Sequence, residues 1–218
     1  MVDPQLDIEP YLEAAAEKSM RITHIFETHV QADHLSGARR LAAATGAPVV
    51  FHESAPVVFP HLDVHDGQRV EMGNVSLSIL HTPGHTPDSV SILVTDKTRA
   101  PEPWFVLTGD TLFSGGVGRP DLFDAGSAAS QAQQLYESVH AQLLKLPDHI
   151  EVFPAHFGGA ACGKGLSGKP GSTIGFERRF NPALRSKSKA EFVDFVLKDL
   201  PPQPDAFAEN RRRNLTGE

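Results

Sequence analysis

"THVQADH", residues 28–34, places His29, Asp33 and His34 within six residues, directly after the apolar run Ile22 to Phe26. Imidazole and carboxylate are common metal ligands, and three of them rarely fall this close together by chance at the end of a strand. A third His at position 31 would complete an H-x-H-x-D-H array, but this position holds Gln31, whose amide is a poor ligand for a first-row metal. The stretch therefore predicts a metal site, and Gln31 bears on whether the site holds one metal or two.

Three further segments also place a polar side chain directly after an apolar strand. They are Thr82-Pro83-Gly84-His85-Thr86, Thr108-Gly109-Asp110-Thr111 and Pro154-Ala155-His156. Each segment alone is more typical of a simple turn, but all four in this order are very unlikely to be accidental. Because ligands at strand ends converge on one edge of a sheet, we expect the four segments to build one metal centre.

Short strands alternate with helices along the chain, which is typical of a layered α/β sandwich. The expected helices span residues 8–18, 37–44, 128–146 and 189–200, and the expected strands span 21–26, 49–52, 70–72, 75–80, 90–95, 104–107 and 151–153. Residues 157–175 are rich in glycine and are expected to form a long loop.

Composition limits the classes of protein that fit. With 218 residues, we expect one domain over residues 1–200 and a polar tail over 201–218. The net charge of −7 argues against nucleic acid or an anionic membrane as a partner, and no apolar run is long enough to span a bilayer. The N-terminus lacks a secretory signal, and the single cysteine, Cys162, allows no intramolecular disulfide; both fit a cytoplasmic protein.

The order of the four segments resembles the metallo-β-lactamase superfamily, whose motifs run H-x-H-x-D-H, Gly-His, Asp and His. Within it, "TPGHTPDS", "TGDTLFSGGVGRPDL" and "FPAH" resemble the branch that contains glyoxalase II and the persulfide dioxygenases, and "ACGKGLSGKPGSTIGFERRFNPAL" resembles bacterial persulfide dioxygenases. The resemblance implies a four-layer αββα sandwich. The family's first two or three strands have no counterpart before Val2, so either the first sheet is smaller, the chain is truncated or its start is misassigned.

The resemblance also implies a ligand set. In glyoxalase II, the residues that match positions 29, 31 and 85 of this chain bind one metal. Those that match Asp33, His34 and His156 bind a second metal, and the residue that matches Asp110 bridges the two. Gln31 removes one ligand of the first metal and leaves His29, His85 and Asp110. Two His and one carboxylate form the facial triad of non-haem Fe(II) oxygenases, so we expect one Fe(II) per chain, with zinc as the alternative.

The remaining three residues, Asp33, His34 and His156, are interpreted as catalytic groups that orient ligands or move protons. Two other readings stay open: they hold a second metal, or they only hydrogen-bond the loops.

Two residues are candidates for substrate binding. In the family, the basic residue that matches Arg119 binds a carboxylate of glutathione. The alternative is that Arg119 forms a surface ion pair with Asp121 or Asp124. The thiol of Cys162 accepts or relays sulfane sulfur if its loop folds over the metal, and otherwise it is a small buried residue.

The sequence thus predicts a persulfide dioxygenase that oxidises glutathione persulfide or a similar small persulfide with O₂ to sulfite and thiol. One alternative is a thioester hydrolase of the glyoxalase II type with a dinuclear zinc or mixed-metal site, and another is an inactive metal-binding module. A separate rhodanese is a candidate partner, because bacterial persulfide dioxygenases often carry such a domain. Homodimers are common in the family, but the sequence does not determine the oligomeric state.

Overall fold

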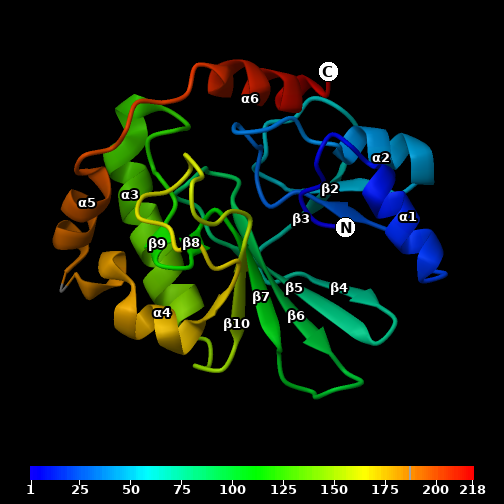
Figure 1. Ribbon diagram of the computed structural model, residues 1–218, viewed down its shortest axis with the longest axis horizontal. Coiled ribbons are helices and arrows are strands. Elements are labelled where there is room, and N and C mark those ends of the chain that lie inside the picture. The colour runs from blue at the N-terminus through cyan, green and yellow to red at the C-terminus, as the bar shows by residue number, and fades with distance from the viewer. Residues whose placement is uncertain (187) are drawn as a thin grey trace. The chain divides into compact units, whose positions relative to one another are not determined.

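Two units, each with its own β-sheet, make up the computed structural model, which describes residues 1–186 and 188–218 (Figure 1). The first unit contains Met1–Val64 and Pro204–Glu218, and the second contains His65–Gln203. The predicted metal-ligand segments are divided between them: residues 28–34 belong to the first unit, and the other three segments belong to the second. Each unit is described by itself.

The first unit has a three-stranded parallel sheet in the order β1-β2-β3. Its strands are β1 Ile25–Phe26, β2 Val49–His52 and β3 Leu62–Val64, and its helices are α1 Glu9–Glu17, α2 Ala38–Thr45 and α6 Ala206–Thr216. Ile25 and Leu41 are fully buried and join β1 to α2 in one hydrophobic core. Helix α2 ends at Gly46, whose φ of 75° is the left-handed conformation that glycine adopts most easily.

Helix α6 lies in the segment that the sequence predicted as a polar tail. Its Asn210 side chain donates to the carbonyl of Ala32 at 3.1 Å, and its Asn214 side chain donates to the carbonyls of Gln31 and His34 at 2.9 and 2.8 Å. The end of the chain therefore supports the backbone of the metal-ligand segment. Short polar side chains at helical spacing gave little apolar pattern from which this helix could be predicted.

The second unit has a six-stranded sheet and a small two-stranded one. The large sheet contains, in spatial order, β11 Ser172–Thr173, β10 Glu151–Pro154, β7 Phe105–Gly109, β6 Val90–Asp96, β5 Val75–His81 and β4 Arg69–Met72. The small sheet pairs β8 Leu112–Phe113 with β9 Gly116–Val117. Strands β4 and β5 form a hairpin at Gly73 and Asn74, as predicted, and Gly73 adopts a φ of 63°.

Three helices lie on one side of this sheet (Figure 1). They are α3 Ala128–Glu137, α4 Ile174–Phe180 and α5 Lys189–Leu197. Leu135 of α3, Ile174 of α4 and Phe192 of α5 are fully buried in one core with Val106 and Val152 of the sheet. The predicted helix over 128–146 continues after α3 as a π-helical turn and a 3-10 turn, and α4 begins within the predicted loop.

Strand direction explains why ligand types gather at one edge of the large sheet. Strands β7 and β10 are parallel neighbours, and β5 also runs in their direction because two antiparallel pairings separate it from β7. Asp110 follows β7 directly, His156 follows β10 by two residues, and His85 follows β5 by four. The carboxyl ends of these three strands therefore lie at the same edge, as expected.

The mixture of helices and sheets confirms the predicted α/β class. Among the described residues, no helix is long and apolar enough to cross a membrane.

Gly84 gives a test of how tightly this edge is packed. It has a φ of 137°, and an added Cβ would lie 2.4 Å from the backbone of Leu135 in α3. Gly84→Ala is expected to lower the free energy of unfolding by about 2 kcal/mol or more, because both the conformation and the space exclude a side chain. Gly168→Ala is the control, since nothing lies within 4 Å of its added Cβ. Urea unfolding measures both, and equal losses would contradict the packing described.

Candidate metal centre

Asp110 is the central carboxylate of the second unit's site. It is 1% exposed and directly follows Gly109, which turns the chain at the end of β7 with a φ of 50°. Its Oδ1 accepts from Nδ1 of His156 at 2.7 Å, and its Oδ2 lies 3.4 Å from Nε2 of His85. The structure therefore brings together His85, Asp110 and His156, three residues that the sequence predicted as site residues.

The orientation of His85 is fixed by the backbone. Its Nδ1 lies 2.9 Å from the carbonyl oxygen of Arg119, which can only accept, so Nδ1 carries the proton and Nε2 carries the lone pair. The Nε2 atom is the one that faces Asp110. An imidazole held through one nitrogen by a carbonyl, with the other nitrogen available as a donor, is the usual arrangement of a metal-ligating His.

Cys162 lies beside Asp110 and His156. One potential ligand atom from each of the three residues lies within 4.8 Å of the others, and Cys162 is 2% exposed. The glycine-rich loop that carries it is held by a hydrogen bond from the Arg119 amide to the Cys162 carbonyl at 3.0 Å. This loop therefore folds over the Asp110 side of the site, the condition that the predicted sulfur relay requires; the relay itself stays a prediction.

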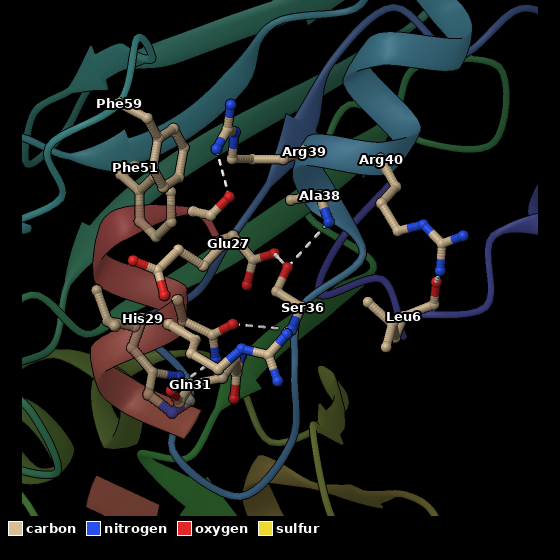
Figure 2. A pocket seen from close by; sticks show the side chains of 15 residues that line it. Leu6, Glu27, His29, Gln31, Ser36, Ala38, Arg39, Arg40, Phe51 and Phe59 are labelled. Carbon is tan, nitrogen blue, oxygen red and sulfur yellow. Dashed lines mark hydrogen bonds between the residues drawn. The ribbon is translucent and has the colours of Figure 1, made fainter. Parts of the chain in front are cut away.

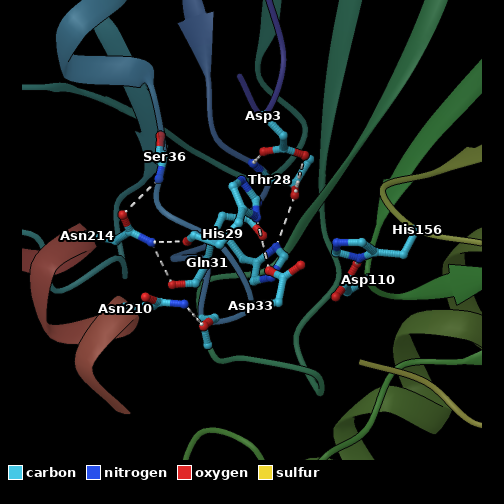
Figure 3. Close-up of polar contacts among 12 residues, drawn as sticks. Asp3, Thr28, His29, Gln31, Asp33, Ser36, Asp110, His156, Asn210 and Asn214 are labelled. Atoms are coloured by element: carbon cyan, nitrogen blue, oxygen red, sulfur yellow. Dashed lines mark hydrogen bonds and ion pairs between the residues drawn. The ribbon is translucent and has the colours of Figure 1, made fainter. Parts of the chain in front are cut away.

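In the first unit, His29 is fixed by a chain of hydrogen bonds (Figure 3). The hydroxyl of Thr28 donates its hydrogen to Oδ2 of Asp3 at 2.9 Å, so its contact of 3.0 Å with Nδ1 of His29 is one that it accepts. Nδ1 of His29 therefore carries the proton, and Nε2 carries the lone pair. His29 and His85 are held in the same tautomer by different partners, a hydroxyl and a backbone carbonyl.

Asp33 and His34 form a pair in the first unit. Nδ1 of His34 lies 3.1 Å from Oδ1 of Asp33, and both side chains are less than one-fifth exposed. Nε2 of His34 is buried and has no hydrogen-bond partner among the residues that the structure describes. A buried ring nitrogen in this position suits a bound ion, a substrate or water, so the catalytic role and the second-metal role both remain predictions.

Gln31 turns its amide toward Glu27. The pKa of Glu27 lies well above its ordinary value, because the carboxyl is fully buried and because Asp3 is close; the neighbouring Ser36 and Gln31 act in the opposite direction. Ser36 donates a short hydrogen bond to Glu27. Neither amide atom of Gln31 makes a hydrogen bond of normal geometry within the described part of the chain.

Arg119 is buried, with a side chain that is 1% exposed, and its guanidinium has several partners. Its guanidinium donates to both carboxylate oxygens of Asp121, at 3.0 and 2.8 Å, and also to the carbonyls of Pro201 and Ala161 at 2.7 and 3.4 Å. Of the two partners considered from the sequence, the structure shows Asp121. Binding a glutathione carboxylate would require this pair to open, so substrate binding by Arg119 stays a prediction, while its role in joining three loops is observed.

The sequence did not indicate the supporting residues. Asp3, Glu27 and Asn214 contact the metal-ligand segment of the first unit, and Thr28 supports His29 from within it. Asp3 and Asn214 lie far from this segment in the chain. Only Thr28 carried a signal, because it directly precedes His29.

Comparisons with known proteins show the family of this chain. Residues 1–156 match the Metallo-beta-lactamase superfamily. The chain is 32% identical over 206 residues to "Persulfide dioxygenase ETHE1, mitochondrial" of Bos taurus, covering 90% of this chain and 72% of that protein. It is 32% identical over 238 residues to the hydroxyacylglutathione hydrolase of Methylococcus capsulatus, covering 97% and 87%.

Two crystal structures are similar along the whole chain. One is ETHE1 from Myxococcus xanthus, with a TM-score of 0.84, 33% identity and coverage of 99% of this chain and 87% of the other. The second is a metallo-beta-lactamase from Staphylococcus aureus subsp. aureus COL, with a TM-score of 0.91 and 34% identity. This chain spans 65% of the length of the Staphylococcus protein.

Removing the hydrogen bond behind His29 is expected to weaken metal binding. Thr28→Val keeps the shape of the side chain but deletes the hydroxyl that links His29 to Asp3. Loss of such a supporting group typically lowers metal affinity by about 10- to 100-fold. Chelator competition with measured metal content tests this, and Thr23→Val, at an exposed threonine, is the control. Equal affinity in both variants would contradict the supporting role.

Arg119→Ala is expected to lower the free energy of unfolding by about 3–5 kcal/mol, because it leaves Asp121 and two carbonyls without their buried donor. Lys97→Ala removes an exposed pair with Glu71 and should cost about 1 kcal/mol or less. Denaturant unfolding compares the two. A small loss for Arg119→Ala together with a raised KM for the substrate would instead favour the predicted substrate contact.

Proposed function

This chain belongs to the metallo-beta-lactamase superfamily, and we propose that within it the chain is a persulfide dioxygenase that uses one non-haem iron. Its proposed substrate is glutathione persulfide or a similar small persulfide, which O₂ converts to sulfite and the thiol. The single observation that carries the proposal is the donor set of two imidazoles and one carboxylate, His29, His85 and Asp110, with glutamine at position 31. The similarity to proteins named persulfide dioxygenase supports it.

A metal cofactor is supported by the superfamily and by the donor types at these positions. The hydrogen bonds of the two imidazoles are compatible with metal binding. His29 and His85 each use Nδ1 in a hydrogen bond to the protein, so each can offer Nε2 as a neutral donor. Asp110 supplies a buried carboxylate, and two imidazoles with one carboxylate and open positions suit Fe(II). Iron rather than zinc is part of the proposal.

Iron would supply open coordination positions and one-electron chemistry with O₂. The overall reaction is R–S–S⁻ + O₂ + H₂O → R–SH + SO₃²⁻ + H⁺, in which the outer sulfur is oxidised and O₂ is reduced. Asp110 and His85 are held by backbone and side-chain contacts before any substrate arrives, which favours a fixed reacting geometry. His156 donates to Asp110 and is the group in the second unit placed to orient this carboxylate and to exchange protons near it.

The loop that carries Cys162 controls access of the substrate to the proposed site. It covers the Asp110 side of the site, and a buried thiol there can contact a sulfane sulfur without exposure to solvent.

The proposal has four further parts. They are glutathione as the carrier thiol, a separate rhodanese that supplies persulfide, a homodimeric state and a cytoplasmic location. The single cysteine supports the last of these.

The experiment combines metal analysis with an oxygen electrode. We expect one iron per chain after anaerobic purification, and O₂ consumption with glutathione persulfide that yields one sulfite per O₂. His85→Ala should lose iron and lower turnover by about 10²-fold or more, because a ligand is removed. His65→Ala changes an exposed histidine outside the site and is the control. A protein that holds only zinc and consumes no O₂ would overturn the proposal.

A thioester hydrolase of the glyoxalase II type is the second candidate. The Asp33–His34 pair, with a buried Nε2 on His34, preserves half of a second metal site, and the chain is similar to a hydroxyacylglutathione hydrolase. Two zinc ions per chain and hydrolysis of S-lactoylglutathione would support it. Any turnover with either substrate excludes an inactive metal-binding module.

A further inference from the structure

Each unit contains a buried glutamate. In the first unit, Glu27 lies beside Ser36 and Gln31 (Figure 2), and the nearby Asp3 adds to the effect of burial in raising its pKa. In the second unit, Glu177 of α4 is 0% exposed, and its carboxyl group accepts hydrogen bonds from several donors. None of the functions considered above uses Glu177.

The carboxyl group of Glu177 holds the tip of the β8–β9 hairpin. Its Oε2 accepts from the backbone amide of Gly115 at 2.9 Å and from Nδ2 of Asn181 at 2.8 Å. Its Oε1 accepts from the hydroxyl of Ser172. Nδ2 of Asn181 also donates to the carbonyl of Gly116 at 3.0 Å. Glu177 and Asn181 therefore bind both glycines at the tip of the hairpin.

Helix α4 gives this contact a fixed base. Ile174, in the first turn of the helix, is fully buried in the core of the second unit. The hairpin tip has less stiffness of its own, because Gly115 has a φ of 88°, a conformation that glycine adopts most easily. An apolar side chain could fill the place of Glu177 without the cost of removing a carboxyl group from water. What Glu177 adds to this core is therefore its hydrogen bonds to the hairpin.

Both ends of the hairpin contact residues of the metal centre. At its first strand, the ring of Phe113 lies 6.4 Å from that of His156, centroid to centroid. Directly after its second strand, an added Cβ at Gly118 would lie 1.9 Å from the carbonyl oxygen of Asp110 and 3.1 Å from Cβ of His85. A shift of the hairpin would therefore change the surroundings of these three site residues.

The carbonyl of Arg119 connects the hairpin to a proposed metal ligand. Arg119 lies three residues after Gly116, and its carbonyl lies 2.9 Å from Nδ1 of His85. The amide and the guanidinium of Arg119 contact loops, whereas the hydrogen bonds at the hairpin tip lead to α4. We propose that Glu177 is a positioning residue: together with Asn181 it fixes the hairpin, so that the Arg119 carbonyl keeps His85 in the tautomer that offers Nε2 to a metal.

This inference rests on the metal centre of the proposed function, but it does not depend on which metal is bound or on the reaction with O₂. Its test compares variants of the full chain by two measurements. Chelator competition gives the affinity for Zn²⁺, and two-bond ¹H–¹⁵N spectra of the metal-free protein give the tautomer of His85.

Glu177→Met keeps a side chain of similar length and removes the acceptor for Gly115. Glu177→Gln keeps an oxygen for Gly115 and Asn181, and its amide can donate to the hydroxyl of Ser172. Zinc affinity is expected to fall by about tenfold or more in Glu177→Met and by less than about threefold in Glu177→Gln. In the metal-free protein, His85 should carry its proton on Nδ1 in the wild type and in Glu177→Gln, and should show both tautomers in Glu177→Met.

Ser172→Ala is the matched control, because it removes a hydrogen bond to the other oxygen of the same carboxyl group. It should leave the zinc affinity and the tautomer of His85 unchanged. If Glu177→Met does not fold, Asn181→Ala takes its place, since it removes the donor to the Gly116 carbonyl and should produce the same two changes.

The proposal is overturned if Glu177→Met binds zinc as the wild type does, or if His85 keeps a single tautomer in it. Equal effects of Ser172→Ala and Glu177→Met, or no recovery in Glu177→Gln, would also overturn it, because Glu177 would then act only on stability. A wild-type chain that binds no zinc would count against the metal centre itself, while the tautomers in the metal-free protein would still decide the role of Glu177.

Discussion

The structure of the site depends on one buried carboxylate. Asp110 is 1% exposed, and a charge removed from water is tolerated only where opposite charge or hydrogen bonds surround it. Two imidazoles approach it, His156 through a hydrogen bond and His85 at 3.4 Å. The backbone packs closely at this point, since an added Cβ at Gly118 would lie 1.9 Å from the Asp110 carbonyl oxygen. A cation bound at this position would supply the opposite charge that the buried carboxylate requires.

The protein sets the state of the donors through groups that are not ligands. A backbone carbonyl orients His85, while a hydroxyl backed by a carboxylate orients His29. A carbonyl cannot donate, so it enforces one tautomer without relying on any other residue. A hydroxyl can donate or accept, and Asp3 removes that freedom by taking its hydrogen. The support of His29 therefore needs two residues, whereas that of His85 needs only correct folding of the Arg119 loop.

Much of the fold and part of the site were predictable from sequence because both rest on local patterns. The apolar runs before His85, Asp110 and His156 predicted strands, and strand direction then placed these residues at one edge. Helix α6 and the Arg119–Asp121 pair were less accessible. The helix is polar, and its two asparagines act on backbone carbonyls 178 to 183 residues away, which leaves no periodic signal. For Arg119, the sequence offered two nearby acids and a substrate role, and only the folded loop distinguishes between the two acids.

Gln31, which stands where the family motif has histidine, can be described both as a ligand type and as a side chain in the folded unit. As a ligand type, an amide is poor for a first-row metal, and this favours a site with one metal. As a side chain in the folded unit, it lies toward Glu27 and faces a cavity. The two descriptions are compatible, because a neutral amide can lie beside a buried carboxyl without exchanging a proton with it. Burial and the nearby Asp3 raise the pKa of Glu27, so this carboxyl holds its proton more strongly than an exposed one does.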